Sequence, residues 1–297
     1  MPLILIFDGN SIMHRAYHAI PPLTSPTGEL VNSVYGFFSI WLAAVKRFQP
    51  DSTAVAFDTK GPTFRDKLFQ EYKAKRVKPP DNFYQQIPII KQLLKDIEVP
   101  MLEKNGFEAD DLIGTLAKKL AQGDWQIIIV TGDQDVFQLI DSKIRVFYPS
   151  KGLGNGDIFG EQEVFNKFGF MPERMVDFKA LAGDPSDNIP GVAGIGKKTA
   201  QTLVCRYAKL DTIYQNIANL SSRTQTLLSA GKSQAELSRQ LAQIDTNAPI
   251  VFSQEDSRLK NFNQEKVEQE FIKLGFKSLV SRLPKSERKN FEQQALL

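Results

Sequence analysis

Histidine and cysteine are scarce in this chain of 297 residues. The two histidines, His14 and His18, offer little material for a histidine-based zinc site or a Ser-His-Asp triad. The single cysteine, Cys205, excludes an intrachain disulfide, so a reducing intracellular setting is expected. Cys205 falls in the apolar helical run TLVCRY, which predicts a buried structural thiol and not a reactive one.

Long apolar runs are also missing. No stretch of 18 or more apolar residues is present, so no transmembrane helix is predicted. The N-terminus, MPLILIFDGN, lacks a basic segment and a small-residue cleavage site, and it predicts the first strand of the fold and not a signal peptide. A formal net charge of +3 permits a nucleic-acid partner without requiring one. A cytoplasmic protein with no membrane association is therefore expected.

Four short apolar runs alternate with amphipathic segments in the first half of the chain. The runs cover residues 3–8, 53–58, 127–133 and 144–149, and the amphipathic segments cover residues 34–48, 83–97 and 109–120. This alternation predicts parallel strands joined by crossover helices that cover both faces of the sheet. Residues 1–172 are therefore predicted to form a doubly wound α/β domain. Residues 173–297 show helical patterns separated by Gly, Pro and Asn turns, and they are predicted to form a second, helical subdomain.

Seven carboxylates are predicted to meet at one edge of this sheet. They are Asp8, Asp58 and Asp133 at the ends of three strands, Asp135 just after the third strand, and Glu108, Asp110 and Asp111 at the start of a helix. In an open parallel sheet, the carboxyl ends of the strands share the edge where ligands bind. Each residue alone has an ordinary explanation as a turn former or helix cap. Together they would repel one another unless cations neutralised them, and oxygen ligands select Mg²⁺ or Mn²⁺, which suits two-metal hydrolysis of a phosphodiester.

A basic segment follows Asp58 closely. Residues 65–78, RDKLFQEYKAKRVK, hold six basic residues against two acidic ones, with Phe69 and Tyr72 between them. A solvated helix face is the ordinary explanation for such a run. Its position beside the carboxylates favours a second one, in which the cations attract a polyanion and the aromatic rings stack on unpaired bases. Two helical pieces around Pro79-Pro80 would then form a mobile arch over the site, at about residues 65–95.

The loop GDPSDNIPGVAGIGKKTA, residues 183–200, combines two aspartates, a glycine-rich turn and a lysine pair at the start of a helix. Its GVAGIGKK part is close to a nucleotide-binding P-loop, with lysine in place of Ser or Thr. A P-loop follows a buried strand, however, whereas a helix and a polar loop ending in proline precede these glycines. Glycines let backbone N–H groups approach a phosphate closely, and a helix N-terminus favours anions. The loop therefore predicts a phosphate contact, and a nucleotide hydrolase is disfavoured.

Six motifs in order carry a family resemblance. They are FDGN (7–10), FD and FR within 57–65, YKAKR (72–76), EADD (108–111), TGDQD with QL (131–139) and the loop 183–200. The set closely resembles the 5′-nuclease domain of bacterial DNA polymerase I, within the flap endonuclease/5′–3′ exonuclease family. The likeness covers nearly the whole chain, including FIKLGFKSL near the end. It implies a PIN-like, mostly parallel α/β sheet with a helical arch, followed by a helix-hairpin-helix subdomain.

The resemblance also implies roles for individual residues. Asp8, Asp58, Glu108 and Asp110 would surround one metal ion, with Asp110 shared, and Asp133, Asp135 and Asp187 would surround the other. Asp111 and Asp184 match additional acidic positions that act through water or a neighbouring ligand. Lys73 and Arg76 would contact the scissile phosphate as catalytic residues, Arg65 would bind a nearby phosphate, and Tyr72 would stack on a base. Gly191, Gly194, Gly196, Lys197, Lys198 and Thr199 would form the hairpin that grips the DNA backbone, with a K⁺ ion in the turn.

The activity implied by the resemblance is metal-dependent 5′–3′ exonuclease and 5′-flap endonuclease cleavage of DNA, in primer or flap removal and in repair. Mg²⁺ is the expected ion, with Mn²⁺ as a substitute. The expected substrates are DNA with 5′ flaps, nicks or 5′ ends, with RNA primers included. A monomer in a bacterial-type cytoplasm, associated with the nucleoid through DNA, is expected. Two alternatives stay open: a non-catalytic, structure-specific DNA-binding module, and an RNA-cleaving relative with the same acidic site.

Overall fold

The computed structural model of the chain describes residues 1–259 and 264–283, so the end of the predicted second subdomain lies outside the described residues. Six strands form one sheet in the order β3-β2-β1-β4-β5-β6. They are β1 (Leu3–Asp8), β2 (Ser52–Ala56), β3 (Met101–Leu102), β4 (Gln126–Val130), β5 (Ile144–Lys151) and β6 (Asn155–Phe159). All neighbouring strands are parallel except β5 and β6, which are antiparallel. The four predicted strands are confirmed as β1, β2, β4 and β5.

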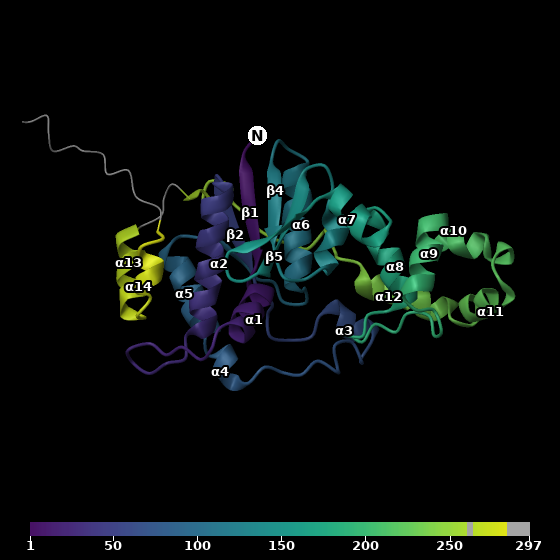
Figure 1. Ribbon diagram of the computed structural model, residues 1–297, viewed down its shortest axis with the longest axis horizontal. Helices are drawn as coiled ribbons and strands as arrows, with labels where there is room; N and C mark the ends of the chain where they lie inside the picture. The colour runs from purple at the N-terminus through teal and green to yellow at the C-terminus, as the bar shows by residue number, and fades with distance from the viewer. Residues whose placement is uncertain (260–263, 284–297) are drawn as a thin grey trace, which may run out of the picture.

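Helices cover both faces of the sheet (Figure 1). On one face lie α1 (Gly9–Ala19), α2 (Asn32–Phe48) and α5 (Ile87–Asp96), and on the other lies α6 (Ala109–Ala121). Successive residues of β1 point to opposite faces, so Leu5 and Phe7 pack with the first group whereas Ile4 and Ile6 pack with α6. Because both faces are buried, the strands are continuously apolar, as parallel strands are. The predicted helices at 34–48 and 109–120 are confirmed, and the segment 83–97 divides into α4 (Asp81–Tyr84) and α5.

The helical subdomain follows α7 (Glu161–Phe168) and occupies one end of the molecule (Figure 1). Its helices are the 3₁₀ helix η2 (Pro172–Arg174), α8 (Met175–Ala182), α9 (Lys197–Tyr207), α10 (Leu210–Gln215), the 3₁₀ helix η3 (Ile217–Asn219), α11 (Ser222–Ala230) and α12 (Lys232–Ala242). Leu181, Val192 and Leu203 belong to the same buried cluster as Ile113 of α6. The core therefore runs without interruption from the sheet into the helical subdomain. No helix within the described ranges is long and apolar enough to cross a membrane.

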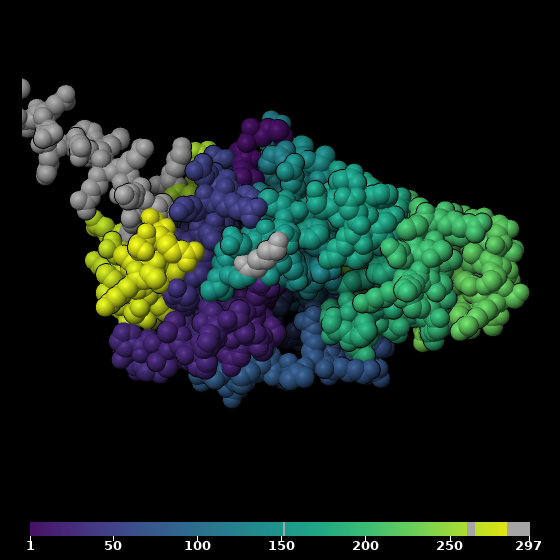
Figure 2. Space-filling model, in the orientation of Figure 1, coloured from purple at the N-terminus to yellow at the C-terminus, as the bar shows by residue number. Residues whose placement is uncertain are grey.

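The last two helices return to the α/β part of the molecule. Helices α13 (Gln264–Lys273) and α14 (Lys277–Val280) lie at the end opposite to the helical subdomain (Figure 2). The ring of Phe271 meets that of Phe38 at 5.4 Å between centroids, and Phe276 meets Tyr35 at the same separation. The apolar faces of these helices complete the core of the α/β part beside α2 and α5.

The predicted arch is helical only at its two ends. Helix α3 (Phe64–Leu68) ends after five residues, and residues 69–80 form turns and extended backbone up to α4. Lys73 has a φ of 55°, which lies outside the helical region. The backbone here bonds to the helical subdomain, since Lys73 N–H donates to Asp187 O at 2.9 Å. The prediction of a helix through the basic segment is therefore wrong beyond Leu68.

Candidate active site

The strand order reverses between β1 and β4, which is where open parallel sheets bind ligands. Asp8 is the last residue of β1, and Thr131 and Asp133 follow β4 directly. The Asp8 carboxylate is 4% exposed, and it accepts hydrogen bonds from Ser11 N–H at 2.9 Å and from Thr131 Oγ1 at 2.7 Å. The first of these bonds caps α1, so the buried carboxylate has a structural task as well.

Helix α6 brings a second group of carboxylates to the same edge. Glu108 is its N-cap, and Asp110 lies in its first turn. The backbone N–H of Ala109 donates to Asp58 Oδ1 at 2.8 Å, which fixes the carboxylate that follows β2. The N-terminus of a helix favours anions, so α6 stabilises this concentration of negative charge.

Burial and mutual repulsion perturb these carboxyl groups strongly. Burial, together with the charges of Asp58 and Asp133, raises the pKa of Asp8 to about 7, although its hydrogen bonds from Ser11 and Thr131 oppose the shift. Burial also raises the pKa of Asp135 to about 7, and Asp133 adds to the shift while Lys179 opposes it. The pKa of Asp110 is raised by burial first and then by Asp8, Asp133 and Asp135. Five of the predicted carboxylates thus lie close enough to interact by charge at this edge: Asp8, Asp58, Asp110, Asp133 and Asp135.

Three cations enter this acidic cluster from outside the sheet. Lys73 Nζ lies 2.8 Å from Glu108 Oε2, and Arg76 Nε donates to Asp187 Oδ1 at 3.0 Å. Lys179, on α8, bonds to the carboxylates of both Asp135 and Asp184. Lys73 and Arg76, predicted to contact a phosphate, are thus held by carboxylates in this structure.

Among these ion pairs, the pair of Asp184 and Lys179 shifts the pKa values of both partners. Burial tends to raise the pKa of Asp184, but Lys179, at 2.6 Å, and hydrogen bonds from Ser186 outweigh it and bring that pKa to about 2. The charges of Asp135 and Asp184 together raise the pKa of Lys179, although burial alone would lower it. Lys179 is therefore a permanent cation between two predicted metal-site residues.

Tyr72 is part of this docked segment and is buried. Its hydroxyl donates at 3.2 Å to Glu108 Oε2 and lies 3.3 Å from Asp187 Oδ2, and the residue is 5% exposed. Asn188 Nδ2 also donates to Glu71 O at 2.7 Å, so the segment is tied to the loop of the helical subdomain. The predicted stacking of Tyr72 on a base does not fit this structure, because its ring faces protein and not solvent.

Arg65 and Asp111 form a buried ion pair away from the opening of the site. Arg65 is 2% exposed and Asp111 is fully buried, and the guanidinium donates to both carboxylate oxygens at 2.8 and 2.9 Å. Arg65 also donates to Leu241 O and Gln243 O, so four of its five N–H groups are hydrogen-bonded to protein. In this structure both side chains are engaged by protein partners, and the phosphate contact of Arg65 and the metal-site role of Asp111 stay predictions.

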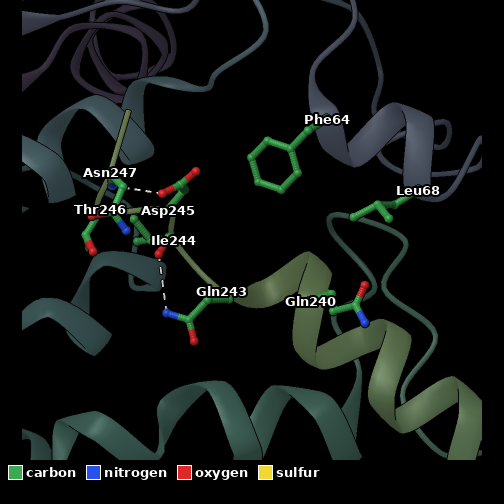
Figure 3. Close-up of a pocket in the computed structure, with 8 residues that line it drawn as sticks. All are labelled: Phe64, Leu68, Gln240, Gln243, Ile244, Asp245, Thr246 and Asn247. Carbon is green, nitrogen blue, oxygen red and sulfur yellow. Dashed lines mark hydrogen bonds between the residues drawn. The ribbon is translucent and has the colours of Figure 1, made fainter. Parts of the chain in front are cut away.

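A cavity of about 470 Å³ lies next to this ion pair, at the junction of α3 and α12. Phe64 and Leu68 of α3 face Gln240 and Gln243 across it (Figure 3). Its walls contain none of the carboxylates of the acidic cluster. The cavity is consequently a feature of the subdomain junction and not of the candidate active site.

The hairpin residues divide into a buried part and an exposed part. Gly191 is buried, and its N–H donates to Ser238 Oγ at 2.9 Å, so this group is not free to bind a phosphate as predicted. Its φ of 63° and its close approach to the Gly183 backbone give it a structural task. The other predicted contacts are exposed, at the hairpin tip and in the first turn of α9: Gly194, Gly196, Lys197, Lys198 and Thr199.

The chemistry of the donor set fits divalent cations, although the side chains are arranged around protein cations. Four cations, Arg65, Lys73, Arg76 and Lys179, lie among the nine predicted carboxyl groups, which therefore outnumber them by five: Asp8, Asp58, Glu108, Asp110, Asp111, Asp133, Asp135, Asp184 and Asp187. Among the described residues, no three His, Cys, Asp or Glu side chains are positioned to surround one ion. Lysine and arginine occupy carboxylate oxygens that an ion would need. Binding of metal ions would therefore require these side chains to exchange partners.

Sequence reasoning missed Lys179 and Thr131. A lysine in the otherwise apolar stretch FKALA, five residues before Asp184, was the available signal for Lys179. Thr131 stands in the quoted motif TGDQD, but only the structure shows its hydroxyl on Asp8. The prediction of a buried Cys205 is wrong, because the residue is exposed and its thiol lies 3.2 Å from Gly169 O.

A mostly parallel α/β sheet with acidic residues at its switch point, joined to a helical subdomain with a glycine-rich hairpin, is the arrangement predicted here for a phosphodiester hydrolase. The comparisons with known proteins make this specific. Residues 3–169 match the family model described as 5′-3′ exonuclease, N-terminal resolvase-like domain, and residues 170–265 match 5′-3′ exonuclease, C-terminal SAM fold. The chain belongs to the 5′-3′ exonuclease family.

Relatives of two lengths resemble the chain. It is 40% identical over 291 residues to DNA polymerase I of Caldicellulosiruptor bescii, covering 97% of this chain and 34% of that protein. It is 35% identical over 285 residues to a 5′-3′ exonuclease of Aquifex aeolicus, covering 96% of both. The chain thus spans about a third of the polymerase relatives and nearly all of the exonuclease.

Solved structures of phage proteins share the fold. The structure of T5 5′-exonuclease with bound zinc has a TM-score of 0.70 at 22% identity, and the match covers 90% of this chain and 99% of that one. A T5 flap endonuclease in complex with DNA and metal ions has a TM-score of 0.67 at 18% identity, over 94% and 96% of the two chains. These likenesses extend over both the sheet and the helical subdomain.

Proposed function

We propose that this chain is a divalent-metal-dependent 5′–3′ exonuclease and 5′-flap endonuclease that hydrolyses DNA phosphodiesters in primer or flap removal and in repair. The observation that carries the proposal is the excess of carboxylates over cations at the β1–β4 switch point. Three of these carboxyl groups have raised pKa values because burial and neighbouring charge disfavour their ionised forms. Divalent cations would relieve that cost. Family membership supports the same reaction.

Mg²⁺ is the proposed ion, with Mn²⁺ as a substitute, since the donors are all carboxylate oxygens. Bound there, it would supply an activated water and offset charge on the leaving oxygen. Asp8, Asp58, Glu108 and Asp110 are proposed to hold one ion, and Asp133, Asp135 and Asp187 another. No side chain need then attack the phosphorus, which agrees with the scarcity of histidine and cysteine.

Lys73 and Arg76 are proposed to contact the scissile phosphate once they leave Glu108 and Asp187. Both are at the opening of the acidic cluster, and Arg76 is half-exposed. A cation there would stabilise the charge that develops on the reacting phosphate. The exposed hairpin residues Lys197 and Lys198 are proposed to hold the duplex, with a K⁺ ion in the turn.

The test uses a labelled 5′-flap duplex incubated with Mg²⁺ or with EDTA. We expect cleavage with Mg²⁺ alone, and we expect Asp133→Asn to abolish it because one predicted ligand loses its charge. Asp124→Asn is the matched control, since Asp124 is exposed in the loop before β4, at the opposite edge of the sheet. Equal cleavage by all samples, EDTA included, would overturn the metal mechanism. Tight flap binding without cleavage in Mg²⁺ would support a non-catalytic DNA-binding module instead.

A further inference from the structure

The two histidines of the chain lie next to each other on the surface of α1. His14 and His18 are both exposed, and the centroids of their rings are 4.6 Å apart. They are four residues apart in an 11-residue helix, which places them on one face with Cβ atoms about 5–6 Å apart. The proposed hydrolysis uses neither of them. Two histidines are too few for a closed zinc site, but the fold brings both to one place.

Two imidazoles with this spacing can act together as ligands of a transition-metal ion. Helical zinc motifs hold their ion with two histidines four residues apart on one helix face. Imidazole nitrogen suits Ni²⁺, Cu²⁺ and Zn²⁺, whereas the carboxylate cluster suits Mg²⁺ and Mn²⁺. No third His, Cys, Asp or Glu side chain joins the pair within the described ranges, so water would fill the other coordination positions. The pair is therefore an open site for a different class of ion.

The surroundings of His14 favour its neutral form, which is the form that binds a metal ion. The ring of Phe83 meets the His14 ring edge-on, at 5.9 Å between centroids, and partly covers it. This partial burial is the main cause that lowers the pKa of His14, and the nearby charges of His18 and Arg76 lower it further. Protons therefore compete less with a metal ion for this nitrogen near pH 7.

Aromatic contacts between α1 and α4 hold the pair in place (Figure 1). The ring of Tyr17 meets that of His18 at 5.3 Å and that of Phe83 at 5.4 Å between centroids. The Tyr17 hydroxyl donates to Asn82 Oδ1 at 2.8 Å, which fixes this ring in turn. Because the neighbouring rings already restrict the two imidazoles, an ion that binds them costs little side-chain entropy.

We propose that His14 and His18 together bind one transition-metal ion of the class that prefers imidazole, at a site separate from the carboxylate cluster. The ion would lie at the junction of α1 and α4, within range of the charge of Arg76 at the opening of the acidic cluster. This site does not depend on the proposed nuclease function. The protein would thus bind two classes of divalent cation, one through oxygen and one through nitrogen.

The test is a calorimetric titration of the untagged chain with Ni²⁺ in saturating Mg²⁺, which occupies the carboxylates first. We expect one Ni²⁺ per chain in the wild type beyond any that displaces Mg²⁺, and its loss in both His14→Gln and His18→Gln. The matched control combines His18→Gln with Ala19→His, at an exposed position. It keeps two histidines but places them five residues apart, off a common helix face, so it should lose the ion as well.

Two further measurements identify the ligands. The chain has two histidines, so Ni²⁺ should broaden both sets of imidazole proton signals together in the NMR spectrum. It should also raise the Tm of the wild type and not of the variants, whose Tm without Ni²⁺ shows that they fold. The exposed thiol of Cys205 is the competing ligand, and Cys205→Ser should keep the ion. If Cys205→Ser loses it, or if the five-apart control binds as the wild type does, the proposal is wrong.

Discussion

The neutral variant Asp8→Asn tests the electrostatics of the acidic cluster most directly. Asp8 is buried at the end of β1, and burial is the main reason that its pKa rises to about 7. The usual value is 3.8, so the folded protein binds this proton more tightly than the unfolded chain does. The free energy of unfolding must therefore fall as the pH rises from about 4 towards about 7, and stay low above that.

The size of the effect follows from the same shift. Between pH 5 and pH 7 the folded carboxyl loses its proton while the unfolded one is already ionised, at about 1.4 kcal/mol per pH unit. Because the slope weakens as the pH approaches the folded pKa, Asp8 alone should remove about 2 kcal/mol of stability over these two units. Asparagine cannot ionise, so Asp8→Asn should lack this part of the pH dependence.

The assay is urea unfolding in EDTA at pH 5, 6, 7 and 8, with Asp124→Asn as the control for a neutralised surface aspartate. We expect the wild type and the control to lose about 3 kcal/mol more than Asp8→Asn between pH 5 and pH 8. Saturating Mg²⁺ should then stabilise the wild type more than Asp8→Asn at pH 8. Parallel pH profiles for Asp8→Asn and the wild type would refute the assignment of Asp8 as a buried titrating group.

Three other substitutions test the structural assignments. Arg65→Gln leaves the buried Asp111 carboxylate without its cation, so the free energy of unfolding, measured by urea unfolding, should fall by about 3–5 kcal/mol. Unchanged stability together with weaker duplex binding would instead support Arg65 as a phosphate ligand. Gly191→Ala should lower the Tm, because the φ of Gly191 is 63° and an added Cβ would lie 2.3 Å from a backbone nitrogen. The control is Gly196→Ala, whose added Cβ would meet nothing within 4 Å. Equal Tm values for the two variants would contradict this reasoning. Lys73→Ala should slow single-turnover cleavage more than it weakens duplex binding, and the opposite result would remove its proposed catalytic role.

The sheet was predictable because its strands are buried on both faces. Continuous apolar runs such as LILIFD indicate such strands without any knowledge of the tertiary contacts. Strand β6, NGDIF, has no such run, and it forms because it pairs antiparallel with β5. The return of α13 and α14 to the α/β part was not predictable either. An amphipathic pattern in the sequence indicates that a helix has an apolar face, but it does not indicate which part of the protein covers that face.

The gathering of the carboxylates was predictable for a similar reason, because parallel strands end at one edge. Which cation meets which carboxylate was not. Arg65 and Asp111 are 46 residues apart, and Arg76 and Asp187 are 111 apart, so tertiary packing alone decides these pairs. A basic run in the sequence predicts attraction to phosphate. Because the same run folds beside the acidic cluster, carboxylates of the protein itself neutralise its positive charge.

The ion pairs also make the acidic cluster the junction between the two parts of the molecule. Lys179, on α8 of the helical subdomain, holds Asp135, which follows β4 of the sheet. Arg76, between α3 and α4, holds Asp187 in the loop before the hairpin. Any cation that took over these carboxylates would release Lys179 and Arg76 from bonds that cross the junction. The charge state of the site and the relative placement of sheet and hairpin are therefore linked, and each must respond to a change in the other.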